Sequence, residues 1–218
     1  MTKYGMLIDR NLCVGCFACA IACKAENGTP RGVFWSKVLT EEVGKYPTAR
    51  INYTPLLCMH CENAPCVTVC PTGASHKRAD GIVVVDYDKC IGCRYCIRAC
   101  PYGARTFIKE ISGYYPGKEL TPYELYAYQK HTVGVAEKCT FCSHRIDEGL
   151  KKGLVPGVDR DATPACVITC VSGARVFGDL EDPNSEVSKL IDSRYAGVLK
   201  PELGTKPKVY YVGVPEEW

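Results

Sequence analysis

The sixteen cysteines of this 218-residue chain fall into four sets of four, and they constrain its fold more than any other feature. The densest set lies in the segment 90–101, which reads CIGCRYCIRACP. The four sets are Cys13, Cys16, Cys19 and Cys23; Cys58, Cys61, Cys66 and Cys70; Cys90, Cys93, Cys96 and Cys100; and Cys139, Cys142, Cys166 and Cys170. Since no cysteine is left over, one kind of site repeated four times accounts for all of them.

The spacing within the sets is that of iron–sulfur cluster ligands. In the pattern C-x2-C-x2-C-x3-C-P, three thiolates bind one [4Fe–4S] cluster and the fourth binds a second cluster. The segment 90–101 has this pattern, the first set repeats its spacing, and the second set has two extra residues before its third cysteine. A long insertion separates Cys142 from Cys166 in the fourth set. The sequence therefore predicts four [4Fe–4S] clusters.

Disulfides and zinc are the alternative uses of these cysteines. An even number of cysteines suits a disulfide framework, but three cysteines within seven residues are awkward to pair because bridged residues need suitably placed Cβ atoms. No secretory signal is recognisable before Cys13. Structural zinc prefers two separated CxxC or CxxH pairs rather than triplets. Iron–sulfur clusters are therefore favoured over both.

The crossed pattern of ligands also predicts which sets share clusters. Each set gives three ligands to its own cluster and one to the cluster of its partner set. The second and third sets are neighbours in the sequence, so we pair them, and the first and fourth sets then pair around them. The predicted ligand groups are Cys58, Cys61, Cys66 and Cys100; Cys70, Cys90, Cys93 and Cys96; Cys13, Cys16, Cys19 and Cys170; and Cys23, Cys139, Cys142 and Cys166.

This nesting predicts an α+β fold of two interleaved ferredoxin-like modules, each with two clusters. The outer module comprises residues 1–50 and 138–180, and the inner module comprises residues 51–108. A tyrosine-rich insertion occupies residues 109–137, and a C-terminal extension occupies residues 181–218.

Internal repeats accompany the cysteine sets. The strand-like segments 4–9 and 81–86 each end in an aspartate four residues before a set begins. Gly73, Gly103 and Gly173 each stand three residues after the last cysteine of a set and precede an alanine. Glycine there would allow a positive φ, or a close approach of backbone amides to sulfur.

Four segments outside the sets have recognisable local patterns. Residues 30–57 predict a strand or hairpin, because Pro47 and Pro55 discourage a long helix. Residues 121–124 read TPYE, a capping box that predicts the start of a short helix. Residues 187–191 have apolar residues at helical spacing, and residues 208–212 read as a strand. The tyrosines of the insertion fit either a partner surface or a lid over a cluster.

Charge and hydropathy exclude several functions. The formal charge of +3 would fall to about −5 with four clusters, because each oxidised cubane with its thiolates contributes about −2. No basic run indicates nucleic-acid binding, and no apolar run approaches the ~18 residues of a membrane span. About half of the basic residues beside the cysteines are expected to be counter-charges and the rest solvated surface. These residues are Lys24, Arg94, Arg98, Arg105, Lys138, Arg145 and Arg175.

The remaining polar residues form no catalytic constellation. His60 and His144 stand beside cluster cysteines, but because every set of four is already complete, hydrogen bonding around a cluster or a surface position is favoured over ligation. No nucleophile–base order, phosphate-binding glycine loop or flavin site is recognisable. The sequence therefore predicts an electron carrier that is not itself an enzyme.

At this level of detail the sequence resembles a known family. The segments CMHCENAPCVTVCPTGA, CIGCRYCIRACPYGAR, CTFCSHR, PACVITC and GARVFGDLEDP are similar to those of the four-cluster electron-transfer subunits of molybdopterin oxidoreductases of the dimethyl sulfoxide reductase family. The iron–sulfur subunits of polysulfide, thiosulfate and respiratory arsenate reductases are the most similar. The resemblance covers nearly the whole chain except the insertion, and Val171 stands where proline is common in the family.

The resemblance implies partners and an arrangement. It implies a large catalytic subunit with a molybdenum or tungsten bis-pterin cofactor, and frequently a membrane subunit that oxidises quinol. The cluster of Cys13 and Cys170 would face the catalytic subunit, and that of Cys70 and Cys90 the electron donor or membrane subunit. Such subunits often lack an export signal and cross the membrane folded with a partner, which favours an extracytoplasmic location over the cytoplasm. The alternatives are a free-standing polyferredoxin with soluble partners and a zinc-stapled interaction module.

Overall fold

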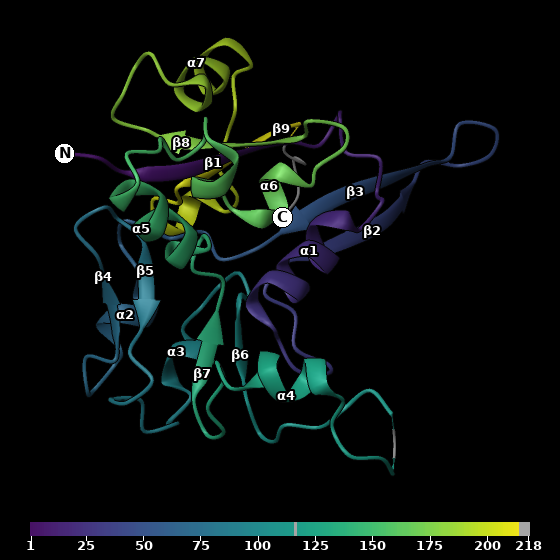
Figure 1. The fold of residues 1–218 in the computed structure, drawn as a ribbon. Coiled ribbons are helices and arrows are strands. Elements are labelled where there is room, and N and C mark those ends of the chain that lie inside the picture. Colours follow the sequence, from purple (N-terminus) through teal and green to yellow (C-terminus); the bar gives the residue numbers. More distant parts are fainter. Residues whose placement is uncertain (116, 214–218) are drawn as a thin grey trace.

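The computed structural model describes residues 1–115 and 117–213, and it shows a mixed α/β fold made of short elements (Figure 1). Pro116 of the predicted insertion and residues 214–218 of the predicted extension lie outside the described residues. Within the described ranges, no helix has the length and apolarity that crossing a membrane requires.

A three-stranded sheet joins the two ends of the chain. In this sheet β1 (Tyr4–Asp9), whose residues are all buried, pairs antiparallel with β8 (Arg175–Asp179) and parallel with β9 (Val209–Val212). The strands predicted at residues 4–9 and 208–212 are thus confirmed. The C-terminal segment therefore packs on its own chain.

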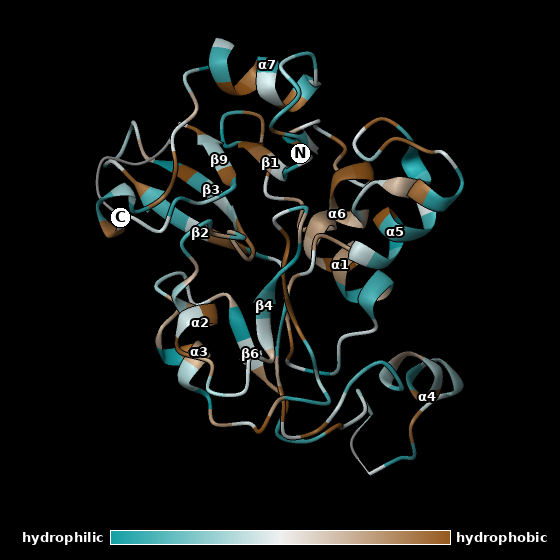
Figure 2. Ribbon diagram, turned by 90° about the vertical axis from the view of Figure 1, so that its left-hand side faces the viewer, coloured by the Kyte–Doolittle hydropathy of each residue, from teal (hydrophilic) through white to brown (hydrophobic). Residues whose placement is uncertain are grey.

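The predicted helix near residue 187 is α7 (Glu186–Ser193), which packs against the sheet beside β1 and β8. The hydroxyl of Ser185 accepts a hydrogen bond from the amide of Ser188, as an N-cap should. Val187 is fully buried, and Figure 2 shows hydrophobic and hydrophilic stretches on the same helix. Its amphipathic pattern explains why it covers the sheet.

Three two-stranded ladders complete the β-structure. The pairs are β2 (Lys37–Val43) with β3 (Arg50–Leu56), β4 (Ser75–Lys77) with β5 (Val83–Val85), and β6 (Arg105–Phe107) with β7 (Ala136–Lys138), all antiparallel. The first pair is the predicted hairpin. In the other two, and in β8 with β1, the strand that follows one cysteine set pairs with the strand that precedes another. Because β7 begins inside the predicted insertion, that segment closes a ladder as well as forming a loop.

Among the described residues, five of the other six helices begin inside the cysteine sets, α4 lies in the insertion, and three of the six are a single turn long. They are α1 (Ala18–Asn27), α2 (Pro65–Thr68), α3 (Tyr95–Arg98), α4 (Pro122–Tyr128), α5 (Ser143–Lys151) and α6 (Ala165–Ile168), with 3-10 turns at Arg160–Ala162 and Pro201–Leu203. Helices this short are marginal in water on their own, so tertiary contacts must hold them.

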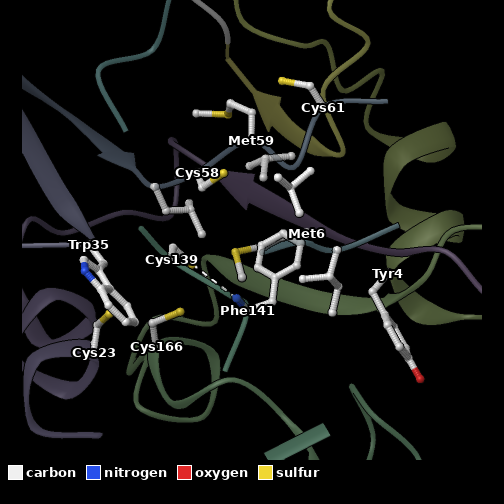
Figure 3. Close-up of a cluster of buried hydrophobic side chains, with 14 of the residues drawn as sticks. Tyr4, Met6, Cys23, Trp35, Cys58, Met59, Cys61, Cys139, Phe141 and Cys166 are labelled. Carbon is white, nitrogen blue, oxygen red and sulfur yellow. Dashed lines mark hydrogen bonds between the residues drawn. The ribbon is translucent and has the colours of Figure 1, made fainter. Parts of the chain in front are cut away.

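The core consists of aromatic side chains and cysteines rather than a thick aliphatic layer. Phe141 is almost fully buried at its centre (Figure 3). Its ring stacks on His60 at 3.8 Å between centroids and meets Phe177 edge-on at 5.2 Å. Phe177 in turn stacks on Tyr4. These rings join residues from both predicted modules into one core.

The insertion contains α4 and a set of exposed tyrosines. The predicted capping box is present: the Thr121 hydroxyl accepts from the Glu124 amide, and the Glu124 carboxylate accepts from the Thr121 amide. Tyr128 is buried on the inner side of α4. Four other tyrosines of the insertion are exposed, namely Tyr114, Tyr115, Tyr123 and Tyr126.

Thr121→Ala should loosen α4 locally. The variant removes the hydroxyl that accepts from the Glu124 amide, and losing such a cap costs about 0.5–2 kcal/mol of helix stability. We expect hydrogen exchange at α4 amides such as Leu125 to become about two- to thirtyfold faster. Thr132→Ala, at an exposed position of the same insertion, should change these rates by no more than about twofold. Unchanged exchange in Thr121→Ala would show that packing, not the cap, holds the helix.

Candidate metal centres

The structure brings the sixteen cysteines together in four groups, and two of them lie in the part predicted as the inner module. Each of these groups lines a pocket, with free space of about 340 Å³ and 310 Å³ including the part open to solvent. The first pocket is lined by Cys58, Cys61, Cys66 and Cys100, and the second by Cys70, Cys90, Cys93 and Cys96. In both, three cysteines come from one set and one comes from the other.

The other two groups are built from the first and fourth sets. Cys13, Cys16, Cys19 and Cys170 line a pocket with about 340 Å³ of free space. Cys23, Cys139, Cys142 and Cys166 are all buried, and Figure 3 shows three of them with Trp35 beside them. Burial raises the pKa of Cys23 well above its ordinary value, and the nearby thiols of Cys139, Cys166 and Cys142 raise it further. These four sulfurs therefore lie close together.

Left-handed residues turn the backbone around each group. Gly15 and Gly92 occupy the same place in the motif C-x-G-C, with φ values of 67° and 69°. A Cβ at Gly15 would lie 2.3 Å from the Tyr53 ring, and one at Gly92 would lie 2.3 Å from a backbone oxygen, so neither position has room for a side chain. Phe17 and Arg94, two residues later, are also left-handed. This conformation is costly for residues other than glycine, which indicates that the loop geometry is demanded by the site.

Backbone amides point at several of the sulfurs. The Ser75 amide donates to Cys70 Sγ at 3.4 Å, and the Phe141 amide donates to Cys139 Sγ at 3.4 Å. Although burial raises it, the pKa of Cys70 is lowered overall by hydrogen bonds, first of all from Ser75. Gly73 has φ 69°, as the sequence predicts for the glycine of this tail. Amide donors of this kind stabilise a thiolate, which is the form that binds metal.

A buried polar network supports the fully buried group. The Asn27 side chain donates to Cys23 Sγ at 3.5 Å and to the Cys23 carbonyl oxygen at 2.9 Å. His131 contacts the Asn27 carbonyl oxygen through Nε2 at 3.0 Å and the Glu137 carboxylate through Nδ1 at 2.8 Å. Sequence reasoning missed this network, because Asn27 and His131, which join its two halves, are more than a hundred residues apart in the sequence.

The two histidines beside cysteines have different roles. His60 is fully buried, and its Nδ1 accepts a hydrogen bond from the Val83 amide at 3.1 Å. Burial lowers the pKa of His60 well below its ordinary value, and the charge of Lys138 lowers it further. His144 is partly exposed and contacts Glu26 at 2.8 Å. His60 thus has a packing and hydrogen-bonding role, while His144 lies at the surface.

Burial varies systematically among the groups. Cys16 and Cys93 are exposed, and each belongs to a different group. The group of Cys139 is entirely buried, and that of Cys58 nearly so. Burial raises the pKa of Cys139, and the thiols of Cys166 and then Cys58 raise it further. Cys58 and Cys139 belong to one buried cluster of the core. A larger, more open depression beside α2 contains none of the cysteines.

The basic residues divide into buried and exposed ones. Arg105, Lys138 and Arg175 are buried. Lys138 donates to the Cys139 carbonyl oxygen at 2.7 Å rather than to a sulfur. Four others are exposed or partly exposed, namely Lys24, Arg94, Arg98 and Arg145. The two buried arginines, which line cysteine pockets, are therefore the best placed to act as counter-charges.

Comparison with known proteins agrees with this geometry. Two models described as 4Fe-4S dicluster domain match the chain, one over residues 49–113 and the other over residues 12–74 and 89–174. The chain is thus a 4Fe–4S dicluster protein. It is 40% identical to the iron–sulfur subunit of the arsenate respiratory reductase of Shewanella sp. ANA-3, over 96% of each chain. It is 41% identical to one chain of the polysulfide reductase of Wolinella succinogenes, over 96% of this chain and 94% of the relative.

A third relative belongs to a reductase that acts on another substrate. One subunit of the selenate reductase of Mesobacillus selenatarsenatis is 44% identical over 95% of this chain and 70% of the relative. The chain therefore belongs to the family of 4Fe–4S dicluster iron–sulfur subunits of molybdoenzymes of the dimethyl sulfoxide reductase family. This confirms the resemblance drawn from the cysteine segments. As a member, it is an iron–sulfur electron-transfer subunit.

Proposed function

We propose that the chain carries four [4Fe–4S] clusters, one in each cysteine group, and passes electrons between a catalytic chain and a second redox partner. The observation that carries this proposal is the grouping of all sixteen cysteines, three from one set and one from its partner set. Bound clusters supply one-electron transfer, and the chain's own residues hold and separate them. The ligand groups are those described for the four sites above, within two interleaved modules, 1–50 with 138–180 and 51–108.

The residues fit this cofactor. Each group offers four thiols. The groups of Cys58, Cys90 and Cys13 line three pockets of nearly equal free volume. Amides such as that of Ser75 point at ligand sulfurs, as expected around iron–sulfur clusters. Structural zinc instead needs four ligands converging within ~2.3 Å of a single ion. In the described ranges, no three or more His, Cys, Asp or Glu side chains are grouped so that they could hold a single metal ion.

Pairs of thiols that influence each other across neighbouring groups indicate the order in which the four clusters would pass electrons, which we call the wire. Cys166 and Cys19 link the two groups of the outer module, because burial and then the Cys19 thiol raise the pKa of Cys166, against the lowering effect of Arg175. Cys139 and Cys58 link the outer to the inner module. The remaining link is between Cys66 and Cys96. From these influences we infer that the groups follow one another from that of Cys13 to that of Cys90.

The first and last groups in this order each have an exposed cysteine, and partners would dock there. Cys16 is exposed at one end and Cys93 at the other. Val14 and Val171, which flank the first end, are 61% and 79% exposed, and Ile91 at the second end is 66% exposed. We assign the Cys16 end to a large molybdopterin catalytic chain, where the substrate reaction takes place. We assign the Cys93 end to an electron donor such as a membrane quinol-oxidising subunit.

A metal inventory of the natural complex, purified without oxygen, tests the proposal. We expect about sixteen iron atoms per chain, from four cubanes, and one molybdenum or tungsten atom on a co-purifying large chain. Iron in this amount without a large chain would indicate a free-standing polyferredoxin. Zinc in place of iron would overturn the cluster assignment.

Substituting the fourth cysteine of the second or of the third set tests the proposed grouping of ligands. Cys100→Ser should remove or weaken the cluster of Cys58, Cys61 and Cys66, with the loss of up to about four iron atoms, because serine is a poorer ligand for iron in such clusters. Its own set's cluster should keep its electron paramagnetic resonance signal. Cys70→Ser is the matched variant and should do the reverse. Loss of the cluster of Cys90, Cys93 and Cys96 in Cys100→Ser would show that the ligands are not crossed.

A further inference from the structure

Two buried arginines occupy the same place in the repeated motif. Ser75, Arg105 and Arg175 each stand five residues after the last cysteine of a set, and each is the first residue of the following strand, in β4, β6 and β8. All three are at least 94% buried. An interior position that repeats in this way and carries a positive charge twice needs an explanation, because unpaired buried charges are costly.

Arg105 lies between the two cysteine groups of the inner module. It lines the pocket of the Cys58 group, while Ser75 lines the pocket of the Cys90 group. Arg105 Nη1 donates to Ser75 Oγ at 2.9 Å. Among the described residues, its Nε and Nη2 donate to no partner, although both atoms are buried. The guanidinium therefore has free N–H groups inside a cavity lined by sulfur.

The surroundings of Arg105 are thiols from both groups. Burial alone would lower the pKa of Arg105, but the sulfurs of Cys66, Cys96 and Cys58 together raise it above its ordinary value. Cys58 and Cys66 belong to one group and Cys96 belongs to the other. One positive charge is thus shared between two sites.

Arg175 has the same place in the outer module. It lines the pocket of the Cys13 group, and its Nη2 donates to Ser36 Oγ at 3.3 Å. Burial would lower its pKa, but Cys166 from the fully buried group and Cys19 from the Cys13 group are the leading influences that raise it. Each predicted module therefore has one buried arginine, one serine partner and thiols from two groups around the arginine.

We propose that Arg105 and Arg175 are positioning residues that favour the reduced state of the two clusters beside them, one arginine for each module. This rests on the proposed function, because it requires the clusters to be present. An oxidised cubane with its thiolates carries about −2, and accepting one electron makes it more negative by one. A fixed guanidinium stays protonated throughout, so it stabilises the added electron without taking up a proton. The electron itself comes from the neighbouring cluster or the redox partner.

Position explains why arginine is needed here. In a buried site, adding negative charge is opposed by the low dielectric, and a nearby positive charge offsets this most effectively where solvent does not screen it. The free Nε and Nη2 groups of Arg105 can also donate to sulfur, which raises the reduction potential of such clusters. Arg98 in the same module is exposed, so solvent screens its charge.

The test is a redox titration of the natural complex, purified without oxygen and followed by electron paramagnetic resonance. Arg105→Gln should make reduction of both inner-module clusters at least tenfold less favourable, which is a shift of about 59 mV for a one-electron couple. Both outer-module clusters should change by less than threefold. Arg175→Gln should show the opposite pattern, and Arg105→Lys, which keeps the charge, should recover most of the effect.

Arg98→Gln is the matched control, because it removes one positive charge from the surface of the same module. It should shift every cluster by less than threefold. Unchanged inner-module potentials in Arg105→Gln at full iron content would overturn the proposal, and so would equal shifts of all four clusters. If Arg105→Gln loses iron, Arg105→Lys decides: iron loss there too would make the arginine purely structural and overturn the proposal. Absence of clusters from the wild-type complex would instead refute the proposed function.

Discussion

We infer that the fold depends on metal binding, because burial alone would keep its cysteine thiols protonated. Burial, together with neighbouring thiols such as that of Cys58, raises the pKa of Cys61 to about 12. Burial likewise raises the pKa of Cys142 to about 12. A metal must displace these protons, and its binding free energy then becomes folding free energy. This matters because helices of four residues such as α2 and α3, and strands of three, bury too little to be stable alone.

The strand pairing shows how one polypeptide encloses four sites. β4 follows the second set and pairs with β5 before the third, while β6 follows the third and pairs with β7 before the fourth. β8 then returns to β1. Each ladder brings the end of one cysteine set to the start of another, so the crossed grouping of the cysteines follows from strand pairing as well as from cysteine spacing. The stacked rings of His60 and Phe141 join the two predicted modules.

The sequence was sufficient where the signal is local. The strand over residues 4–9, the hairpin within 30–57 and the start of α4 at Thr121 all depend on patterns a few residues long, and the structure contains each of them. It was not sufficient where the outcome depends on distant contacts. Arg98 and Arg105 look equivalent as basic residues beside cysteines, yet one is exposed and the other buried. They differ in burial because Arg98 ends α3 whereas Arg105 begins β6. One signal in the sequence could have indicated this, since Arg105 and Arg175 both stand five residues after the last cysteine of a set. The contact of His131 with Asn27 had no local signal at all.

Burial and charge have opposite effects along the proposed wire. The middle groups are buried, which prevents solvent from reaching an electron in transit but also makes each added negative charge harder to accept. The end groups reach the surface at Cys16 and Cys93, where partners can approach. Each arginine feels the charge of one middle group and one end group, through Cys66 and Cys96 for Arg105 and through Cys166 and Cys19 for Arg175. In the proposed arrangement, one positive charge therefore offsets the cost of adding an electron to a buried middle cluster. It also favours reduction of the end cluster with which that middle cluster exchanges electrons.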